Sequence, residues 1–326
     1  MNWAIEMPEI EVAFKLNVQD KILMLGSCFT ENIGAKFLEL GMNVTINPAG
    51  SHYHAMSSFD FLDRIVANKT FTNDDIVQHQ QKFYSWHHHT SINDKACEVL
   101  LNNINNTLST VRQSIDTTDV LIITLGTAIG YTLLSNDTLV ANCHKQNPTL
   151  FVKNLSTSND IYLKARNVLI GLFEQNKTLK VLLTVSPVRY IKDGLVDNNR
   201  SKAQLIEAIR LLQKCFSNVF YFPAYEVIID VLRDYRFYKE DKVHPTNEAI
   251  TELWHWFVSN YFTDHHQHII KEISKLNRAC SHQSDTFIGA FIQKNEALLQ
   301  TIQNAAPTLN LSKYRTRLTE LKKYAE

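Results

Sequence analysis

The sequence predicts a three-layer α/β/α fold built on a five-stranded parallel sheet. Two alternating kinds of segment lead to this prediction. Short apolar segments with the length of buried strands occur at residues 22–25, 43–46, 120–125, 180–185 and 219–222. Segments with apolar residues at helical spacing lie between them, at residues 32–40, 58–66, 97–115, 160–173 and 201–215. Strands that alternate with helices are typical of a parallel sheet covered on both faces, and five strands favour the flavodoxin-like class.

Composition and charge are those of an ordinary soluble globular protein. The 326 residues are 44% apolar, and 33 basic residues balance 33 acidic ones. This balance argues against nucleic acid as the main partner, because phosphate binding needs concentrated positive charge. No segment has the length and apolar character of a membrane span, and residues 1–6 lack the basic start of a signal peptide. The five cysteines include no CxxC pair, which indicates free thiols in a reducing cytoplasm. Because no membrane span is predicted, we expect no membrane partner.

The pattern of the chain changes near residue 264. No strand pattern follows, and helical patterns run through 269–276, 287–302 and 311–324, with Pro307 between the last two. We therefore expect a domain at 1–264 and a helical extension at 265–326. Two roles for the extension stay open: packing against the domain, or forming a homo-oligomer.

The end of the first predicted strand is the most informative point of the sequence. Gly26-Ser27-Cys28 follows this strand and precedes a helical pattern. Ser27 should lie at the carboxyl edge of the sheet, where α/β proteins bind ligands and a helix N-terminus favours negative charge. The alternative is that Ser27 only caps the helix. We interpret Cys28 as a small buried residue, since free cysteines are usually buried.

A second segment, at residues 241–245, offers a base for Ser27. Asp241 precedes His244 by three residues, so in a tight turn its carboxylate can reach one ring nitrogen of the imidazole. A serine, a base and an orienting carboxylate are what acyl transfer requires. A surface carboxylate and a helix-capping histidine would give the same pattern. The chain has no GxSxG motif, so an α/β-hydrolase nucleophile is not indicated.

Several motifs, in order along the chain, are similar to those of one family. Residues 26–30 read GSCFT, and the chain resembles the GSCFA family, which is named for that pentapeptide. Further matches stand at 122–128, 140–145, 184–189 and 234–245, so the resemblance covers roughly residues 20–260. The family is similar to the SGNH (GDSL-like) hydrolases, which include esterases, lipases and carbohydrate deacetylases. The resemblance implies an SGNH fold.

The resemblance also implies a catalytic triad. Ser27 matches the SGNH nucleophile, while Asp241 and His244 match its acid and base. His244 would take the proton of the Ser27 hydroxyl and then give it to the leaving alcohol. Asp241 would orient the imidazole.

The oxyanion hole departs from the SGNH pattern. The backbone N–H groups of Ser27 and Gly50 match two of the usual donors. The asparagine of the usual GxND motif is absent, because residues 126–129 read GTAI. Losing one such donor typically costs about 100- to 1000-fold in rate. Thr127, a histidine at 87–89 and the N–H of Cys28 stay open as substitutes.

Three further residues are candidates for binding the substrate. His88 belongs to the run 87–89, in a long connection that we expect to line a pocket. Neighbours on an extended chain face opposite ways, so this run does not indicate a metal site. His144 and Arg189 lie beyond strand ends and suit an anionic group of the substrate, although structural salt bridges are the alternative for both.

These observations predict a serine esterase of the SGNH type. Its substrate would be an acylated small molecule, and a carbohydrate by analogy with the superfamily alone. The chemistry requires no cofactor and no metal. Two alternatives are an acyltransferase on the same fold and a catalytically silent binding protein, which the missing asparagine favours.

Overall fold

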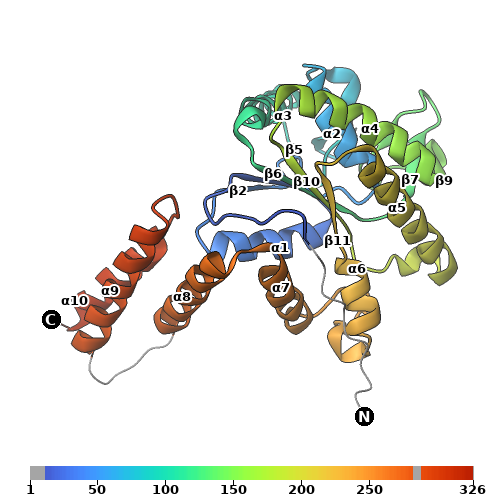
Figure 1. Cartoon of the computed structure of the whole chain (residues 1–326). Helices are drawn as coiled ribbons and strands as arrows, with labels where there is room; N and C mark the ends of the chain where they lie inside the picture. The colour runs from blue at the N-terminus through green and yellow to red at the C-terminus, as the bar shows by residue number, and fades with distance from the viewer. Residues whose placement is uncertain (1–11, 282–287, 326) are drawn as a thin grey trace, which may run out of the picture. The chain divides into compact units, whose positions relative to one another are not determined.

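The computed structural model describes residues 12–281 and 288–325, and these form two compact units (Figure 1). The first unit holds Ile22–Asn32 and Thr45–Ile250. The second holds Ile33–Val44, residues 12–21 and the described residues from 251 onward. The predicted domains 1–264 and 265–326 stay a prediction. Residues 1–6, on which the expected absence of a signal peptide rests, lie outside the described residues, as does residue 287.

The first unit is built on a five-stranded parallel sheet, which confirms the predicted α/β class. Gly26 pairs with Thr124, and Thr124 with Thr184, so three neighbouring strands end at one edge. These three strands are buried almost throughout, which explains why they read as continuous apolar runs. The strands are β1 (Ile22–Gly26), β2 (Val44–Ile46), β6 (Val120–Leu125), β10 (Lys180–Val185) and β11 (Val219–Phe222), in the order β11-β10-β6-β1-β2.

Four long helices of the first unit share a core with this sheet. They are α2 (Ala55–Val66), α3 (Cys97–Ser114), α4 (Ser158–Gln175) and α5 (Leu195–Cys215). Each helix presents an apolar face to the strands, and the shared core includes Phe59, Leu108, Leu169 and Leu205 of the helices and Leu23, Ile123 and Leu183 of the strands. Helix α4 begins with a capping box, in which Thr157 and Asp160 exchange hydrogen bonds between side chains and backbone N–H groups.

Two small antiparallel sheets of the first unit are absent from the sequence-based prediction. One joins β3 (Ile76–His79), β4 (Lys82–Ser85) and β5 (Asn93–Asp94), and the other joins β7 (Ile129–Leu133), β8 (Leu139–Val140) and β9 (Phe151–Leu155). Their strands are short and mostly half-exposed or exposed, so no long apolar run marks them. Short helical segments also occur, at Asn73–Asp75, Ile115–Thr117, Pro148–Leu150, Ile191–Asp193, Ala224–Glu226, Val227–Val231 and Tyr235–Phe237.

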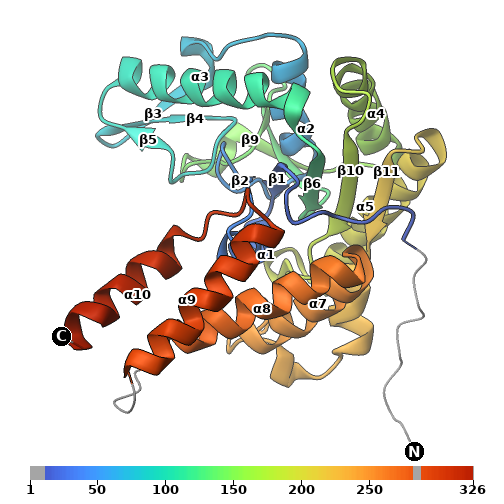
Figure 2. The ribbon, with the colours of Figure 1, turned by 60° about the vertical axis from the view of Figure 1, so that its left-hand side comes forward.

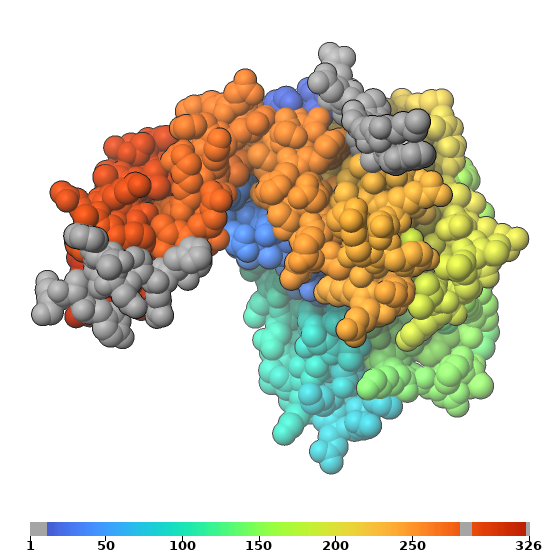
Figure 3. Space-filling model, turned by 90° about the horizontal axis from the view of Figure 1, so that it is seen from below, coloured from blue at the N-terminus to red at the C-terminus, as the bar shows by residue number. Residues whose placement is uncertain are grey.

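The second unit is helical. Helix α1 (Cys28–Glu39) runs into it from the first unit, and α7 (Asn247–Tyr261), α8 (Asp264–Ser281), α9 (Ile288–Ala305) and α10 (Ser312–Ala325) follow, which confirms the predicted C-terminal helices. Helix α9 packs against both α8 and α10 (Figure 2). Figure 3 shows the surface of these C-terminal helices in orange and red. None of the described helices combines the length and apolar character that a membrane crossing needs.

The start of α10 is held by the end of α1 within this second unit. The N–H of Asn310 donates to the carbonyl oxygen of Gly41 at 2.8 Å. The Tyr314 hydroxyl donates to the carbonyl oxygen of Glu39 at 3.1 Å. These bonds satisfy carbonyl groups that the end of a helix leaves without intrahelical partners.

Candidate active site

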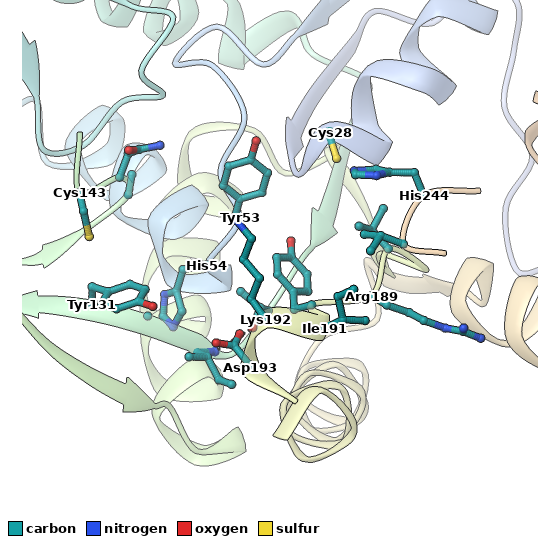
Figure 4. Close-up of a pocket in the computed structure, with 18 of the residues that line it drawn as sticks. Cys28, Tyr53, His54, Tyr131, Cys143, Arg189, Ile191, Lys192, Asp193 and His244 are labelled. Carbon is teal, nitrogen blue, oxygen red and sulfur yellow. Dashed lines mark hydrogen bonds between the residues drawn. The ribbon is translucent and has the colours of Figure 1, made fainter. Parts of the chain in front are cut away.

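A cavity of about 660 Å³ opens at the carboxyl edge of the central sheet (Figure 4). Its walls come from segments that follow β1, β6 and β10 and from the loop before α7. The sequence motifs at 122–128, 140–145, 184–189 and 234–245 each contribute residues to these walls. The order of those motifs along the chain was therefore a usable signal for the site.

Gly26 sets how the chain leaves β1 and enters the cavity. Its φ is +132°, and a Cβ at this position would lie 2.2 Å from the carbonyl oxygen of Thr124. Glycine is required here because no other residue fits both the dihedral angle and the close approach. The chain then passes through Ser27 and begins α1 at Cys28. This turn decides which of the two neighbouring side chains reaches the cavity.

Cys28 lines the cavity, and Ser27 does not. Ser27 is 0% exposed, and its Oγ accepts a hydrogen bond from the N–H of Phe29 at 3.3 Å. The sulfur of Cys28 points toward the imidazole of His244, which lines the same cavity (Figure 4). The expectation that Ser27 faces the site and that Cys28 is the buried neighbour is thus reversed by the geometry of the turn.

Asp241 and His244 form the hydrogen-bonded pair that their spacing suggests. Asp241 Oδ2 lies 2.7 Å from His244 Nδ1. Asp241 Oδ1 accepts from the N–H groups of Val243 and His244 at 2.9 and 3.0 Å. These bonds, the backbone N–H of His244 first and its imidazole next, lower the pKa of the Asp241 carboxyl well below its usual range. Because Nδ1–H donates to Asp241, the neutral imidazole keeps Nε2 as an acceptor that can take a proton.

The Cys28 thiol is not ionised in advance of reaction. Burial raises its pKa above the ordinary value, and the Glu31 carboxylate on the same helix raises it further. The N–H groups of Cys28 and Phe29 at the start of α1 and the Lys202 ammonium act in the opposite direction. Cys28 therefore needs a base to become a nucleophile at neutral pH, and His244 is placed to be one.

The predicted oxyanion donors are already engaged within the protein. The N–H of Gly50 donates to the Asn47 carbonyl at 2.7 Å, and Gly50 does not line the cavity. The N–H of Ser27 donates to the Thr124 carbonyl at 3.3 Å.

Thr127 lines the cavity, but its polar groups are also engaged. Its N–H donates to the carbonyl of Tyr53 at 2.8 Å. Its hydroxyl shares a 2.9 Å hydrogen bond with the hydroxyl of Ser201 and accepts from the N–H of Ile129 at 3.0 Å. The hydroxyl therefore holds the loop after β6 in place.

Two of the three predicted substrate-binding residues lie away from the cavity. His88 is 0% exposed and bonds to the Ser85 hydroxyl at 2.9 Å. His144 donates from Nε2 to the carbonyl oxygen of Ser85 at 2.8 Å and stacks on Tyr84. Burial holds the pKa of both imidazoles below the ordinary value, to about 4 for His144. Both residues pack the interior of the first unit instead of facing a ligand.

Arg189 does line the cavity. Its guanidinium lies 4.1 Å from the ring centroid of Tyr238 and 5.3 Å from that of Tyr235. Its N–H donates to the carbonyl of Val243 at 3.2 Å, which ties the segment after β10 to the loop of the Asp–His pair. Stacking on tyrosine rings keeps the planar cation ordered, and the side chain extends away from the other labelled cavity residues (Figure 4).

Other cavity residues follow from the fold and not from a residue pattern. They include His54, Tyr131, Asn142 and Asp193. The Asp193 carboxylate pairs with the Lys153 ammonium, and His54 bonds to the carbonyl oxygen of Ala128 at 3.2 Å. Within residues 12–281 and 288–325, no group of three or more His, Cys, Asp or Glu side chains is arranged to hold a metal ion.

Among known proteins, the chain matches a family model. The family model of the GSCFA family matches residues 21–257, which is most of the chain and includes every residue of the cavity. No curated protein matches.

Proposed function

The chain belongs to the GSCFA family, and from this premise and the cavity geometry we propose that it is an acyl-transferring hydrolase with Cys28 as its nucleophile. One observation carries the proposal. The Cys28 sulfur shares a cavity with His244, and Asp241 fixes the tautomer of His244. The triad is thus Cys28-His244-Asp241, one residue displaced from the serine version predicted by the sequence. Convergent hydrolases use a cysteine in the place of serine with the same roles.

The reaction follows from these positions. His244 Nε2 takes the proton of the Cys28 thiol as the sulfur attacks the acyl carbonyl and forms the S–C bond. The carbonyl π pair moves onto oxygen. The pair returns as the bond to the leaving alcohol breaks, and His244 gives its proton to that alcohol. Water then attacks the thioester with His244 again as base, which releases the acid and regenerates the thiol.

The cavity fits an acylated small molecule. Its volume is in the range of small-ligand sites, and its apolar residues, such as Val140 and Val188, suit an acyl chain. Asn142, Asp193 and Arg189 supply polar groups on the same walls, which suit a hydroxyl-bearing leaving group such as a carbohydrate. If an acceptor alcohol attacked the thioester in place of water, the same site would catalyse acyl transfer instead of hydrolysis.

The test compares two neighbouring substitutions, with p-nitrophenyl acetate and butyrate as substrates. We expect Cys28→Ala to lower kcat/KM by about 1000-fold or more, because it removes the attacking atom. Ser27→Ala should retain the rate within about fivefold, because it removes one hydrogen bond at the turn and no reacting atom. A Ser27→Ala enzyme without activity beside an active Cys28→Ala enzyme would overturn the assignment. A wild-type protein that cleaves neither ester and takes up no acyl group would point to the silent binding protein.

A further inference from the structure

We infer that the hydroxyl of Tyr190 is the donor that holds the oxyanion during acyl transfer to Cys28. This inference rests on the proposed function and supplies the part that the missing asparagine leaves open. Three of the donors named from the sequence are engaged elsewhere, because the N–H groups of Ser27 and Gly50 and the groups of Thr127 bond within the protein. The oxyanion that forms when the Cys28 sulfur attacks needs a donor in the cavity wall.

The hydroxyl of Tyr190 is buried and has no partner among the described residues. Tyr190 lines the cavity. Its backbone N–H donates to Asn198 Oδ1 at 2.9 Å, which fixes the position of the Tyr190 backbone in the cavity wall. Its Oη forms no hydrogen bond. A buried hydroxyl without a partner costs about 1–3 kcal/mol. Such a group in a cavity wall is expected when a bound molecule supplies the acceptor.

The hydroxyl lies beside the segment that stands in place of the GxND motif. A Cβ on Gly126 would lie 2.6 Å from Tyr190 Oη, so the hydroxyl rests against the residue that follows β6. Gly126 is also the first residue of the GTAI segment that replaces GxND. Any side chain at position 126 would displace the hydroxyl. The close approaches of Tyr190 and of the Tyr53 carbonyl oxygen, 2.4 Å from the same Cβ position, together account for a glycine at this point.

Lys202 is buried beside Tyr190, and burial lowers the pKa of its ammonium group to about 7. The Nζ of Lys202, on α5, donates to the carbonyl oxygens of Gly126 and Ser186 at 2.7 and 2.6 Å. It lies 5.1 Å from the ring centroid of Tyr190. No carboxylate in the described part of the chain pairs with it. In its protonated form Lys202 strengthens the phenol as a hydrogen-bond donor, and an anion forming nearby would favour that protonated form.

Tyr190 donates a hydrogen bond in this step without losing its proton. As the S–C bond forms, the carbonyl pair moves onto oxygen, and the phenol O–H donates to that oxygen. Burial raises the pKa of Tyr190 well above its ordinary value, so the donor stays protonated through the neutral range. The hydrogen bond relaxes when the carbonyl re-forms. The helix N-terminus at Cys28 supplies further stabilisation of the same charge.

The experiment separates acylation from simple attack by the thiol. Iodoacetamide alkylates a cysteine without forming an oxyanion, whereas p-nitrophenyl acetate forms one. Both rates are measured at Cys28 by mass spectrometry and p-nitrophenol release, in wild type, Tyr190→Phe and Tyr225→Phe. Tyr225 is the matched control, because its ring centroid lies 5.8 Å from Lys202 Nζ but the residue does not line the cavity.

The expected result is a selective loss in one variant. Tyr190→Phe should lower the acylation rate by about 100- to 1000-fold and leave alkylation within about twofold, while Tyr225→Phe changes neither rate by more than about threefold. Equal losses of both rates in Tyr190→Phe would assign the residue a structural role and overturn the inference, and so would unchanged acylation. If wild-type Cys28 is alkylated but never acylated, the proposed function fails first, and the inference fails with it.

Discussion

The loop that carries His244 and the buried histidine group (His52, His54, His88 and His144) place the same side chain in two different environments. The His244 side chain is 42% exposed and bonds to a carboxylate. Each member of the buried group is at most 3% exposed and bonds to hydroxyl or carbonyl oxygens. Burial lowers the pKa of every member, to about 4 for His52, His54 and His144. The comparison teaches that histidines can be abundant around a site while only one is placed to exchange protons.

A carboxylate partner alone does not make a histidine a base. His87 also bonds to a carboxylate, since its Nε2 lies 2.9 Å from Asp75 Oδ1. The same oxygen accepts from Arg64 at 2.6 Å, and His87 does not line the cavity. The pair of His244 and Asp241 differs because the His244 imidazole lines the cavity, where the Cys28 sulfur points toward it. Placement, more than pairing, separates the two histidines.

Removing His244 should have the largest effect. We expect His244→Ala to lower kcat/KM for p-nitrophenyl butyrate by about 1000- to 10,000-fold, because the raised pKa of Cys28 makes the thiol depend on a base. Its melting temperature should stay near that of wild type, since the side chain is partly exposed. His87→Ala is the control and should retain the rate within about fivefold. Equal losses in the two variants would break the comparison.

Lowering the pH should destabilise the fold through the four histidines of the buried histidine group. Their folded pKa values lie below the ordinary 6.5, so between pH 6.5 and about 4 the unfolded chain binds protons that the folded chain does not. The free energy of unfolding should be highest above pH 6.5 and fall as the pH drops, by up to about 1.4 kcal/mol per pH unit for each histidine. Urea unfolding at pH 7.5, 6.0 and 5.0 measures this slope.

Two variants sharpen the acid experiment. His88→Gln removes one titrating group and should make the slope shallower, whereas His265→Gln changes an exposed histidine and should leave it unchanged. A stability that is flat from pH 7.5 to 5.0 in wild type would contradict the assignment of these histidines as buried and neutral.

The sheet and the Asp–His pair could be predicted because their signals are local. Continuous apolar runs mark β1, β6 and β10, and a three-residue spacing places Asp241 beside His244. The sequence could not tell which of Ser27 and Cys28 faces the cavity. That outcome depends on the φ of Gly26 and on α1 beginning at Cys28, which the residue types do not encode.

Long-range placement explains the other differences. His88 and His144 looked like pocket residues because they are polar and follow irregular segments, yet both bond to Ser85 in the interior. No sequence motif marks Tyr190. Its proposed role depends on its contacts with Gly126 and Lys202, which lie in other parts of the chain. Residues that act through the tertiary fold in this way are visible only once the elements are assembled.

The location of the acyl group during turnover tests the central claim most directly. Wild-type protein is mixed with p-nitrophenyl butyrate, quenched in acid within the first turnover, digested and mapped by mass spectrometry. The account predicts a butyryl group on Cys28, removed by neutral hydroxylamine as a thioester is, and absent from His244→Ala. A butyryl group on Ser27 that resists neutral hydroxylamine would contradict it.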